Sequence, residues 1–227
     1  MLYTEQSVRA NIRNRDGKRV FFLGKGDTLT PGARDFLSRE RIEILGAEEA
    51  KIETYRLLSG GYIKEKPEYM THLHGDVLVN KTHPRIAFRG MIDLLEGEIM
   101  LCQLVVEEPV RRQLGQILAL ARKLIRCDVL NEPVSAERLC GFTQEEIRQR
   151  SHFPQDHYGQ PHFMPEYTDG EMILRLNRCR AIARQTELAA VRAFSDGDGN
   201  PTRVDILQAL NRISSMLYIL MIQLKKG

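Results

Sequence analysis

The sequence predicts a mainly α protein: an antiparallel five-helix-type bundle that follows a small N-terminal α/β segment. Two observations support this fold class. From Pro84 onward, apolar residues recur at helical spacing in four long stretches and one or two short ones, joined by short connections. Before residue 70, short apolar runs and one helical stretch alternate with turn residues. We therefore divide the chain into an accessory region at 1–58, a linker at 59–70 and a helical-bundle domain at 71–227.

The accessory region contains a predicted strand, helix and strand. The apolar run RVFFLG at 19–24 favours a short strand. In TPGARDFLSR, Thr30 is placed as the N-cap and Pro31 as the first helical residue, positions that these residue types favour. The run IEIL at 42–45 predicts the second strand. The linker that follows, LSGGYIKEKPEY, combines glycine and proline with a charged stretch.

The bundle helices have recognisable starts and faces. The first is predicted over 84–107, with Pro84 in its first turn. The second, over 108–130, has an apolar face made of Val110, Leu114, Ile117, Ala121, Leu124 and Ile125. Thr143 and Glu146 form a capping-box pattern that starts a short helix. A loop rich in histidine, proline and aromatic residues then leads to the last two long helices, which the turn SDGDGNP separates.

Composition narrows the class of protein. With 42% hydrophobic and 28% charged residues, the 227-residue chain can bury a substantial core. The net charge of +3 suits an anionic ligand, but basic and acidic residues are interleaved, so nucleic acid is not an expected partner. The N-terminus lacks the apolar core of a signal peptide, and the longest apolar run is too short to span a bilayer. We therefore expect a cytoplasmic protein without membrane contact, whose four scattered cysteines are reduced and mostly in the core.

Polar residues gather on one face of each of the last two long helices. Arg180, Arg184 and Glu187 follow i, i+4, i+7 spacing. The final helix carries a second set: Asn211, Ser214, Ser215 and Tyr218. Each set alone is compatible with a solvated face holding an Arg184–Glu187 pair, or with a polar helix–helix contact in an oligomer. Together they favour a nucleotide triphosphate site, since arginine suits phosphate and asparagine offers a donor and an acceptor.

The motifs in these helices resemble those of a known family. RCRAIARQTE followed by ILQALNRISSMLYILM is similar to the paired C-terminal motifs of ATP:cob(I)alamin adenosyltransferases of the helical-bundle class. Further segments, LTPGARDFLSRERI, MTHLHGDVLVNKTHPRIAFRGMIDLL and IRCDVLNEP, extend the similarity to the ethanolamine-utilisation branch. The resemblance covers nearly the whole chain in order, and it is most specific in the last two helices.

This resemblance implies roles for particular residues. The implied ATP-binding set is Thr71, His72, Lys81, Arg184, Glu187 and Asn211. Of these, Arg184 and Lys81 would be catalytic, because with Mg²⁺ they would stabilise charge on the departing triphosphate. Arg180 is implied to pair with Asp93 across a subunit interface, which would place ATP between neighbouring protomers.

The resemblance also implies the reaction. Cob(I)alamin is a strong nucleophile that attacks C5′ of the ATP ribose and yields adenosylcobalamin and triphosphate, so the protein mainly has to align the reactants. The loop PHFMPEY would face the corrin ring through His162, Phe163 and Pro165. Either His162 or Phe163 would shield the lower face of cobalt; removing the lower axial ligand makes the metal easier to reduce.

Three features depart from the wider family. The glycine-rich TKxGDxG stretch is replaced by THLHGDVLVNK, and Ser215 stands where an aspartate is common. The cysteine-rich motif that precedes the bundle in some members is absent from SGGYIKEKPEYM, so we predict no structural metal. His72, His74 and His83 lack the ligand set of a zinc site, and Pro201 occupies the glycine position of an EF-hand loop. The first two departures keep open an alternative function, a non-catalytic ATP/cobalamin-binding sensor or carrier on the same scaffold.

The family context further implies partners. Its members form homo-oligomers, here a trimer or a dimer, with ATP between subunits. The product, adenosylcobalamin, would supply ethanolamine ammonia-lyase. Microcompartment components are further implied partners, and the interior of a bacterial microcompartment is an implied location within the cytoplasm.

Overall fold

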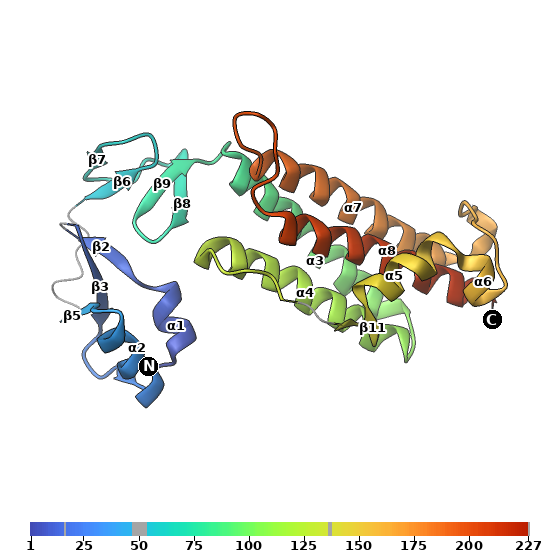
Figure 1. The fold of residues 1–227 in the computed structure, drawn as a ribbon, viewed down its shortest axis with the longest axis horizontal. Helices are drawn as coiled ribbons and strands as arrows, with labels where there is room; N and C mark the ends of the chain where they lie inside the picture. Colours follow the sequence, from blue (N-terminus) through green and yellow to red (C-terminus); the bar gives the residue numbers. More distant parts are fainter. Residues whose placement is uncertain (16, 47–53, 136–137, 227) are drawn as a thin grey trace. The chain divides into compact units, whose positions relative to one another are not determined.

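The computed structural model describes residues 1–15, 17–46, 54–135 and 138–226. The chain forms two compact units, one from Met1 to His83 and one from Pro84 onward. We describe each unit by itself (Figure 1).

The N-terminal unit is built from short strands and two helices. Its elements are β1 Leu2–Tyr3, α1 Glu5–Ala10, β2 Arg13–Arg15, β3 Lys18–Leu23, β4 Thr28–Leu29, α2 Pro31–Arg39, β5 Glu43–Gly46, β6 Tyr55–Leu57, β7 Tyr62–Ile63, β8 Met70–His74 and β9 Val77–Asn80. They form a β1–β4 pair, a three-stranded sheet β2–β3–β5 and a four-stranded sheet β7–β6–β9–β8. Strands β3 and β5 are parallel neighbours, so α2 is the crossover between them.

The predicted strand, helix and strand of the accessory region are confirmed. The Thr30 hydroxyl accepts a hydrogen bond from the backbone N–H of Ala33 at 3.3 Å, and Pro31 opens α2. The helix buries Phe36 and Leu37 against Phe21 of β3 in a small separate core. The sequence thus specifies this unit locally, through a cap and a short apolar face.

The four-stranded sheet differs from the predicted layout. Residues 59–70, predicted as a linker, contain β7, and residues 71–80, predicted as part of the bundle domain, form most of the β8–β9 hairpin. The hairpin turns at Gly75, whose φ of +51° favours glycine, and an added Cβ there would lie 3.3 Å from the Ile12 carbonyl oxygen. Leu73 and Leu78 are almost fully buried, so this sheet holds its own apolar contacts, and the structural division falls after His83.

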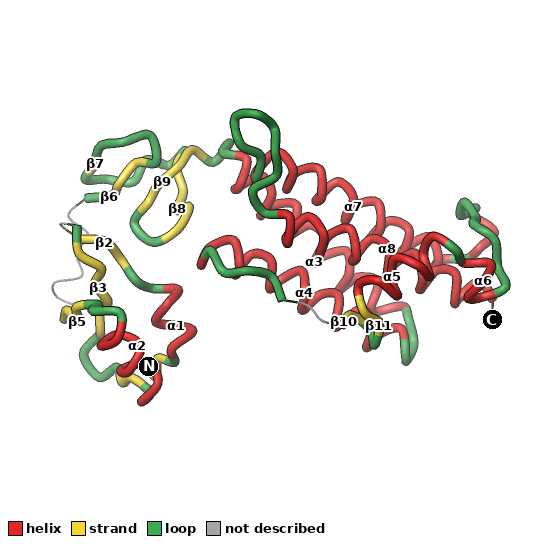
Figure 2. Tube along the Cα trace, in the orientation of Figure 1, coloured by secondary structure: helices red, strands yellow, loops and turns green. Residues whose placement is uncertain are grey.

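The second unit is helical. Its elements are α3 Pro84–Val105, α4 Val110–Leu130, β10 Arg138–Leu139, β11 Phe142–Thr143, α5 Gln144–His152, α6 Pro154–Tyr158, the 3₁₀ turn η2 Tyr167–Asp169, α7 Glu171–Ala193 and α8 Val204–Lys226. Helix α3 packs against α4 and α7, α7 packs against α8, and the short α5 lies on α8. Figures 1 and 2 show that α3 runs opposite to α4 and α7, and α7 opposite to α8. The mainly α prediction is confirmed.

Apolar periodicity accounts for this packing. Phe88, Ile92, Leu95 and Ile99 recur at three- and four-residue intervals on α3 and are fully buried. The predicted capping box is present: Glu146 N–H donates to the Thr143 hydroxyl at 3.2 Å, and Thr143 N–H donates to the Glu146 carboxylate at 2.7 Å. The four cysteines are free, and three of them are buried, as predicted.

Two ionic clusters fix one end of the bundle. The fully buried carboxylate of Asp128 near the end of α4 accepts from Arg85 Nε at 2.8 Å and from Arg89 Nε at 2.7 Å, both at the start of α3. Nearby, Asp205 of α8 accepts from Arg203 Nε at 2.9 Å. That hydrogen bond is the largest cause that lowers the pKa of Asp205 to about 2.

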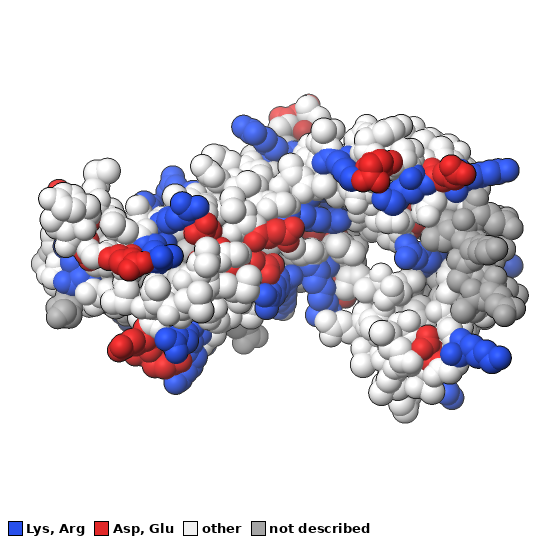
Figure 3. Space-filling view, turned by 180° about the vertical axis from the view of Figure 1, so that it is seen from behind, with Lys and Arg blue, Asp and Glu red and all other residues white. Residues whose placement is uncertain are grey.

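Surface charge is mixed. On the face drawn in Figure 3, lysine and arginine side chains alternate with aspartate and glutamate. Among the helices that the structure describes, none is both long and apolar enough to cross a membrane.

Candidate functional site

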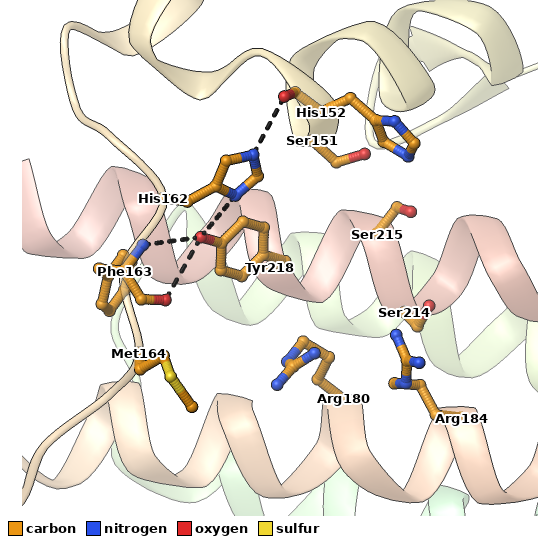
Figure 4. Close-up of a pocket in the computed structure, with 10 residues that line it drawn as sticks. All are labelled: Ser151, His152, His162, Phe163, Met164, Arg180, Arg184, Ser214, Ser215 and Tyr218. Atoms are coloured by element: carbon orange, nitrogen blue, oxygen red, sulfur yellow. Dashed lines mark hydrogen bonds between the residues drawn. The ribbon is translucent and has the colours of Figure 1, made fainter.

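A pocket of about 440 Å³ lies where α5, α7 and α8 meet the loop that precedes α7. Figure 4 shows the side chains that line it: Ser151, His152, His162, Phe163, Met164, Arg180, Arg184, Ser214, Ser215 and Tyr218. Two of its walls are the polar faces that the sequence predicted on the last two long helices. The third is the histidine- and proline-rich loop. The pocket therefore combines cations from α7, hydroxyls from α8 and aromatic rings from the loop.

The two α7 arginines that line the pocket differ in their partners. Arg180 donates from Nε and Nη2 to the Asn177 side-chain oxygen at 3.1 and 2.9 Å. Burial, followed by the charge of Arg184 one turn away, lowers the pKa of Arg180. Arg184 is exposed and forms no hydrogen bond or ion pair with any residue that the structure describes, Glu187 included. Its guanidinium is thus available for an anion, and two neighbouring cations favour one.

One turn along α7 and α8, Asn211 joins the two helices. Its Nδ2 donates to Glu187 Oε1 at 3.3 Å, and its Oδ1 accepts from Arg212 Nη1 at 2.8 Å. These partners fix the orientation of the amide, because glutamate can only accept and arginine can only donate. Ser214, buried in the next turn, donates to the Asn211 carbonyl oxygen at 3.0 Å.

The aromatic wall is tied to α8 by Tyr218. The backbone N–H of Phe163 donates to the Tyr218 hydroxyl at 3.1 Å, and the same hydroxyl lies 3.2 Å from His162 Nδ1. His162 Nε2 lies 3.0 Å from the His152 carbonyl oxygen, which can only accept. Nε2 therefore carries the hydrogen, and in the neutral ring Nδ1 is an acceptor for the Tyr218 hydroxyl, whose other acceptor is the Phe163 carbonyl oxygen at 3.4 Å.

The chemistry available here is recognition and alignment. Guanidinium groups and an oriented amide suit a phosphate-bearing ligand, and the aromatic wall suits a flat, largely apolar one. In the described ranges, no three histidine, cysteine, aspartate or glutamate side chains are grouped so as to hold a metal ion.

Comparison with known proteins identifies the family. The family model of cobalamin adenosyltransferases matches residues 61–224. This chain belongs to the cobalamin adenosyltransferase family. Family membership confirms the predicted resemblance, and with it the assignment to transferases that act on cobalamin.

Curated relatives agree with the family assignment. The corrinoid adenosyltransferase EutT of Salmonella typhimurium strain LT2 is 29% identical over 242 residues, which span 96% of this chain and 90% of that protein. The corrinoid adenosyltransferase EutT of Escherichia coli K12 is 28% identical over 242 residues, which again span 96% of this chain and 90% of that protein. This chain is therefore similar to EutT-type members of the family over almost its full length.

The predicted ATP-binding residues fall in both units. Arg184 lines the pocket, whereas Glu187 and Asn211, which bond to each other across α7 and α8, lie outside its lining. The other three lie in the N-terminal unit. Lys81, just after β9, donates to Glu68 at 3.0 Å, and the ring of His72 on β8 meets that of Tyr55 edge to face, with centroids 5.6 Å apart.

The remaining N-terminal residue is Thr71, which pairs with Val79 across the β8–β9 hairpin. Because the two units are described separately, the ATP-binding roles of Lys81, Thr71 and His72 remain predictions.

The predicted corrin-facing and interface residues are placed as follows. His162 and Phe163 line the pocket, and the half-buried Pro165 follows Met164 just outside the pocket lining. Asp93 is exposed on α3. Its pairing with an arginine of another subunit remains a prediction.

Sequence reasoning missed three lining residues, which are Ser151 and His152 of α5 and Met164 of the loop. Their contribution depends on tertiary packing of α5 on α8, for which the local sequence carries no signal.

Proposed function

We propose that this family member transfers the 5′-deoxyadenosyl group of ATP to cob(I)alamin and uses Arg184, Glu187 and Asn211 to hold the nucleotide. The observation that carries the proposal is the pocket itself: a free guanidinium faces an aromatic loop across about 440 Å³, and the oriented Asn211 amide lies one turn before the lining residues Ser214 and Ser215 on α8. The cobalt–C5′ bond forms as the C5′–O5′ bond breaks, and triphosphate leaves with the electron pair. Arg184 stabilises the charge that grows on triphosphate.

Within this proposal Lys81 supplies a second cation to triphosphate, with Thr71 and His72 beside it. The family match begins at residue 61 and so includes the β8–β9 hairpin, which supports treating 71–227 as one functional domain. We assign residues 1–58 an accessory role. Helix α5, which packs on α8, would serve as the fifth helix of the bundle.

The nucleotide would bind as Mg-ATP. Mg²⁺ prefers oxygen ligands and keeps several waters while it bridges phosphates. Glu187 offers carboxylate oxygens beside Asn211, so its chemistry fits a role in holding the hydrated ion.

A homo-oligomer, trimer or dimer, would place ATP between protomers through the Asp93–Arg180 pair. The exposure of Asp93 supports this arrangement. By analogy with the EutT-named relatives, adenosylcobalamin would supply ethanolamine ammonia-lyase, with microcompartment components as further partners.

The test is an anaerobic assay. Purified protein is mixed with chemically reduced cobalamin and Mg-ATP, and absorbance follows the loss of cob(I)alamin and the formation of a light-sensitive Co–C product. We expect one triphosphate for each adenosylcobalamin. Persistent cob(I)alamin in the presence of both bound ligands would refute the transfer reaction and favour a binding protein.

A further inference from the structure

The Tyr218 hydroxyl connects three elements around the pocket. It accepts from the backbone N–H of Phe163 at 3.1 Å, and its own proton has two acceptors within reach, His162 Nδ1 at 3.2 Å and the Phe163 carbonyl oxygen at 3.4 Å. His162 in turn donates from Nε2 to the carbonyl of His152, the last residue of α5, at 3.0 Å. One phenol oxygen thus ties the loop to α8 and, through His162, to α5 (Figure 4).

Ring contacts reinforce this attachment. The Tyr218 ring stacks on His162 with centroids 5.8 Å apart and on Phe163 at 5.9 Å. Lys225 Nζ lies 4.3 Å from the Phe163 ring centroid and also pairs with Asp169 at 2.8 Å. Residues 160–166 have no helix or strand of their own, so these side-chain contacts supply much of what holds the segment.

We infer that Tyr218 is a positioning residue whose hydroxyl preorganises the loop at His162 and Phe163 as a wall for the corrin substrate before that substrate binds. This inference rests on the proposed function. A wall that is already ordered spares the binding step the entropy cost of ordering the segment.

The same bonds determine what His162 can do. An imidazole with a free nitrogen lone pair is a common metal ligand. Here Nε2 carries hydrogen and donates, and Nδ1 is directed at the Tyr218 hydroxyl 3.2 Å away, so both ring nitrogens are engaged by protein groups. His162 therefore faces the substrate without ligating cobalt.

The chain offers a matched pair of variants. Tyr218→Phe keeps the stacked ring and removes only the hydroxyl. Tyr158→Phe is the control, because the Tyr158 hydroxyl on α6 is buried with no hydrogen-bond partner in the described structure. Amide hydrogen exchange of the full-length protein without substrate should be about tenfold faster over residues 160–166 in Tyr218→Phe than in the wild type. A tenfold change corresponds to the free energy of one or two hydrogen bonds. Exchange unchanged from that of the Tyr158→Phe control would overturn the inference.

Steady-state kinetics separate positioning from general stability. Tyr218→Phe should raise KM for cob(I)alamin about tenfold and leave KM for ATP unchanged. A parallel rise in both constants would indicate a general structural role and would overturn the inference. Wild-type protein that fails to turn over cob(I)alamin would reject the proposed function and the corrin role together. Wild-type turnover with Tyr218→Phe indistinguishable from Tyr158→Phe would reject the inference alone.

Electron paramagnetic resonance tests the state of His162. The probe is cob(II)inamide, which lacks the nucleotide base, so any nitrogen splitting of its cobalt signal must come from the protein. Bound to the wild type, it should show no such splitting. Splitting that disappears in His162→Ala would show that His162 ligates cobalt, against the inference.

Discussion

Replacing Arg184 by alanine should weaken ATP binding without destabilising the protein. Arg184 is exposed and pairs with no described residue, so its removal should change the free energy of unfolding by no more than about 0.5 kcal/mol. A hydrogen bond to a charged group contributes about 1.5–3 kcal/mol. A loss of about 2 kcal/mol in binding corresponds to an affinity about 30-fold weaker.

Thermal unfolding with Mg-ATP measures this loss. At about 100 times the wild-type Kd, ATP adds about 2.7 kcal/mol of stability, and a 30-fold weaker variant keeps about 0.9 kcal/mol. At about 2–4 °C per kcal/mol, the Tm shift should fall from about 5–11 °C to about 2–4 °C. Arg192→Ala is the matched control, since Arg192 is exposed two turns further along α7 and outside the pocket. Equal shifts in the two variants would show that Arg184 does not contact the nucleotide.

Three further predictions concern stability and assembly. Asp128→Ala should cost about 3–5 kcal/mol in denaturant unfolding, because it removes the fully buried carboxylate that Arg85 and Arg89 both bind. Glu171→Ala breaks an exposed pair and should cost under about 1 kcal/mol; similar losses in the two variants would contradict the reasoning. The pKa of Asp205 is about 2, below its ordinary value of about 3.9, so its contribution is present above pH 4 and lost as the pH falls toward 2; Asp205→Asn should flatten that part of the stability profile, and an unchanged profile would reject this role. Asp93→Asn and Arg180→Ala should each reduce assembly in analytical ultracentrifugation together with activity, and intact, fully active oligomers would refute the interface pair.

The bundle could be predicted from sequence because its signals are local. Apolar spacing, Pro84 at a first turn and the Thr143–Glu146 box each act within one helix or one turn, and the structure places helices there. The sheet of β6 to β9 has weaker signals: its strands are short, and β6 pairs directly and in parallel with β9, although β7 and β8 lie between them in the sequence. Such pairings depend on tertiary contacts, so the predicted linker at 59–70 missed β7.

The candidate site could be predicted in part for the same reason. Spacing alone places Arg180, Arg184 and Glu187 on one helix face. On the next helix, spacing likewise places Asn211 on one face with Ser214, Ser215 and Tyr218. The bond between Tyr218 and Phe163 joins residues 55 positions apart, and neither residue shows in its own neighbourhood that it has this partner. The family resemblance supplied the loop's proposed corrin-facing role but not what holds the loop in place.

Polar groups are costly to desolvate, and on α8 they lie beside fully buried residues such as Ile213 and Leu217; Ser214 is itself buried, whereas Asn211 is exposed. Their partners in this structure are mostly protein groups: Asn211 bonds Glu187 and Arg212, Ser214 bonds a carbonyl one turn back, and Tyr218 bonds the loop. A nucleotide would therefore add to an existing hydrogen-bond network, because these three side chains already have hydrogen-bond partners in the protein. Since that network already orients the amide and the aromatic wall, most of the ordering cost falls on folding and not on substrate binding. Of the α7 cations at this face, Arg184 has no hydrogen-bond or ion-pair partner among the described residues, and it is therefore the position at which the proposed triphosphate would add the most new interaction energy.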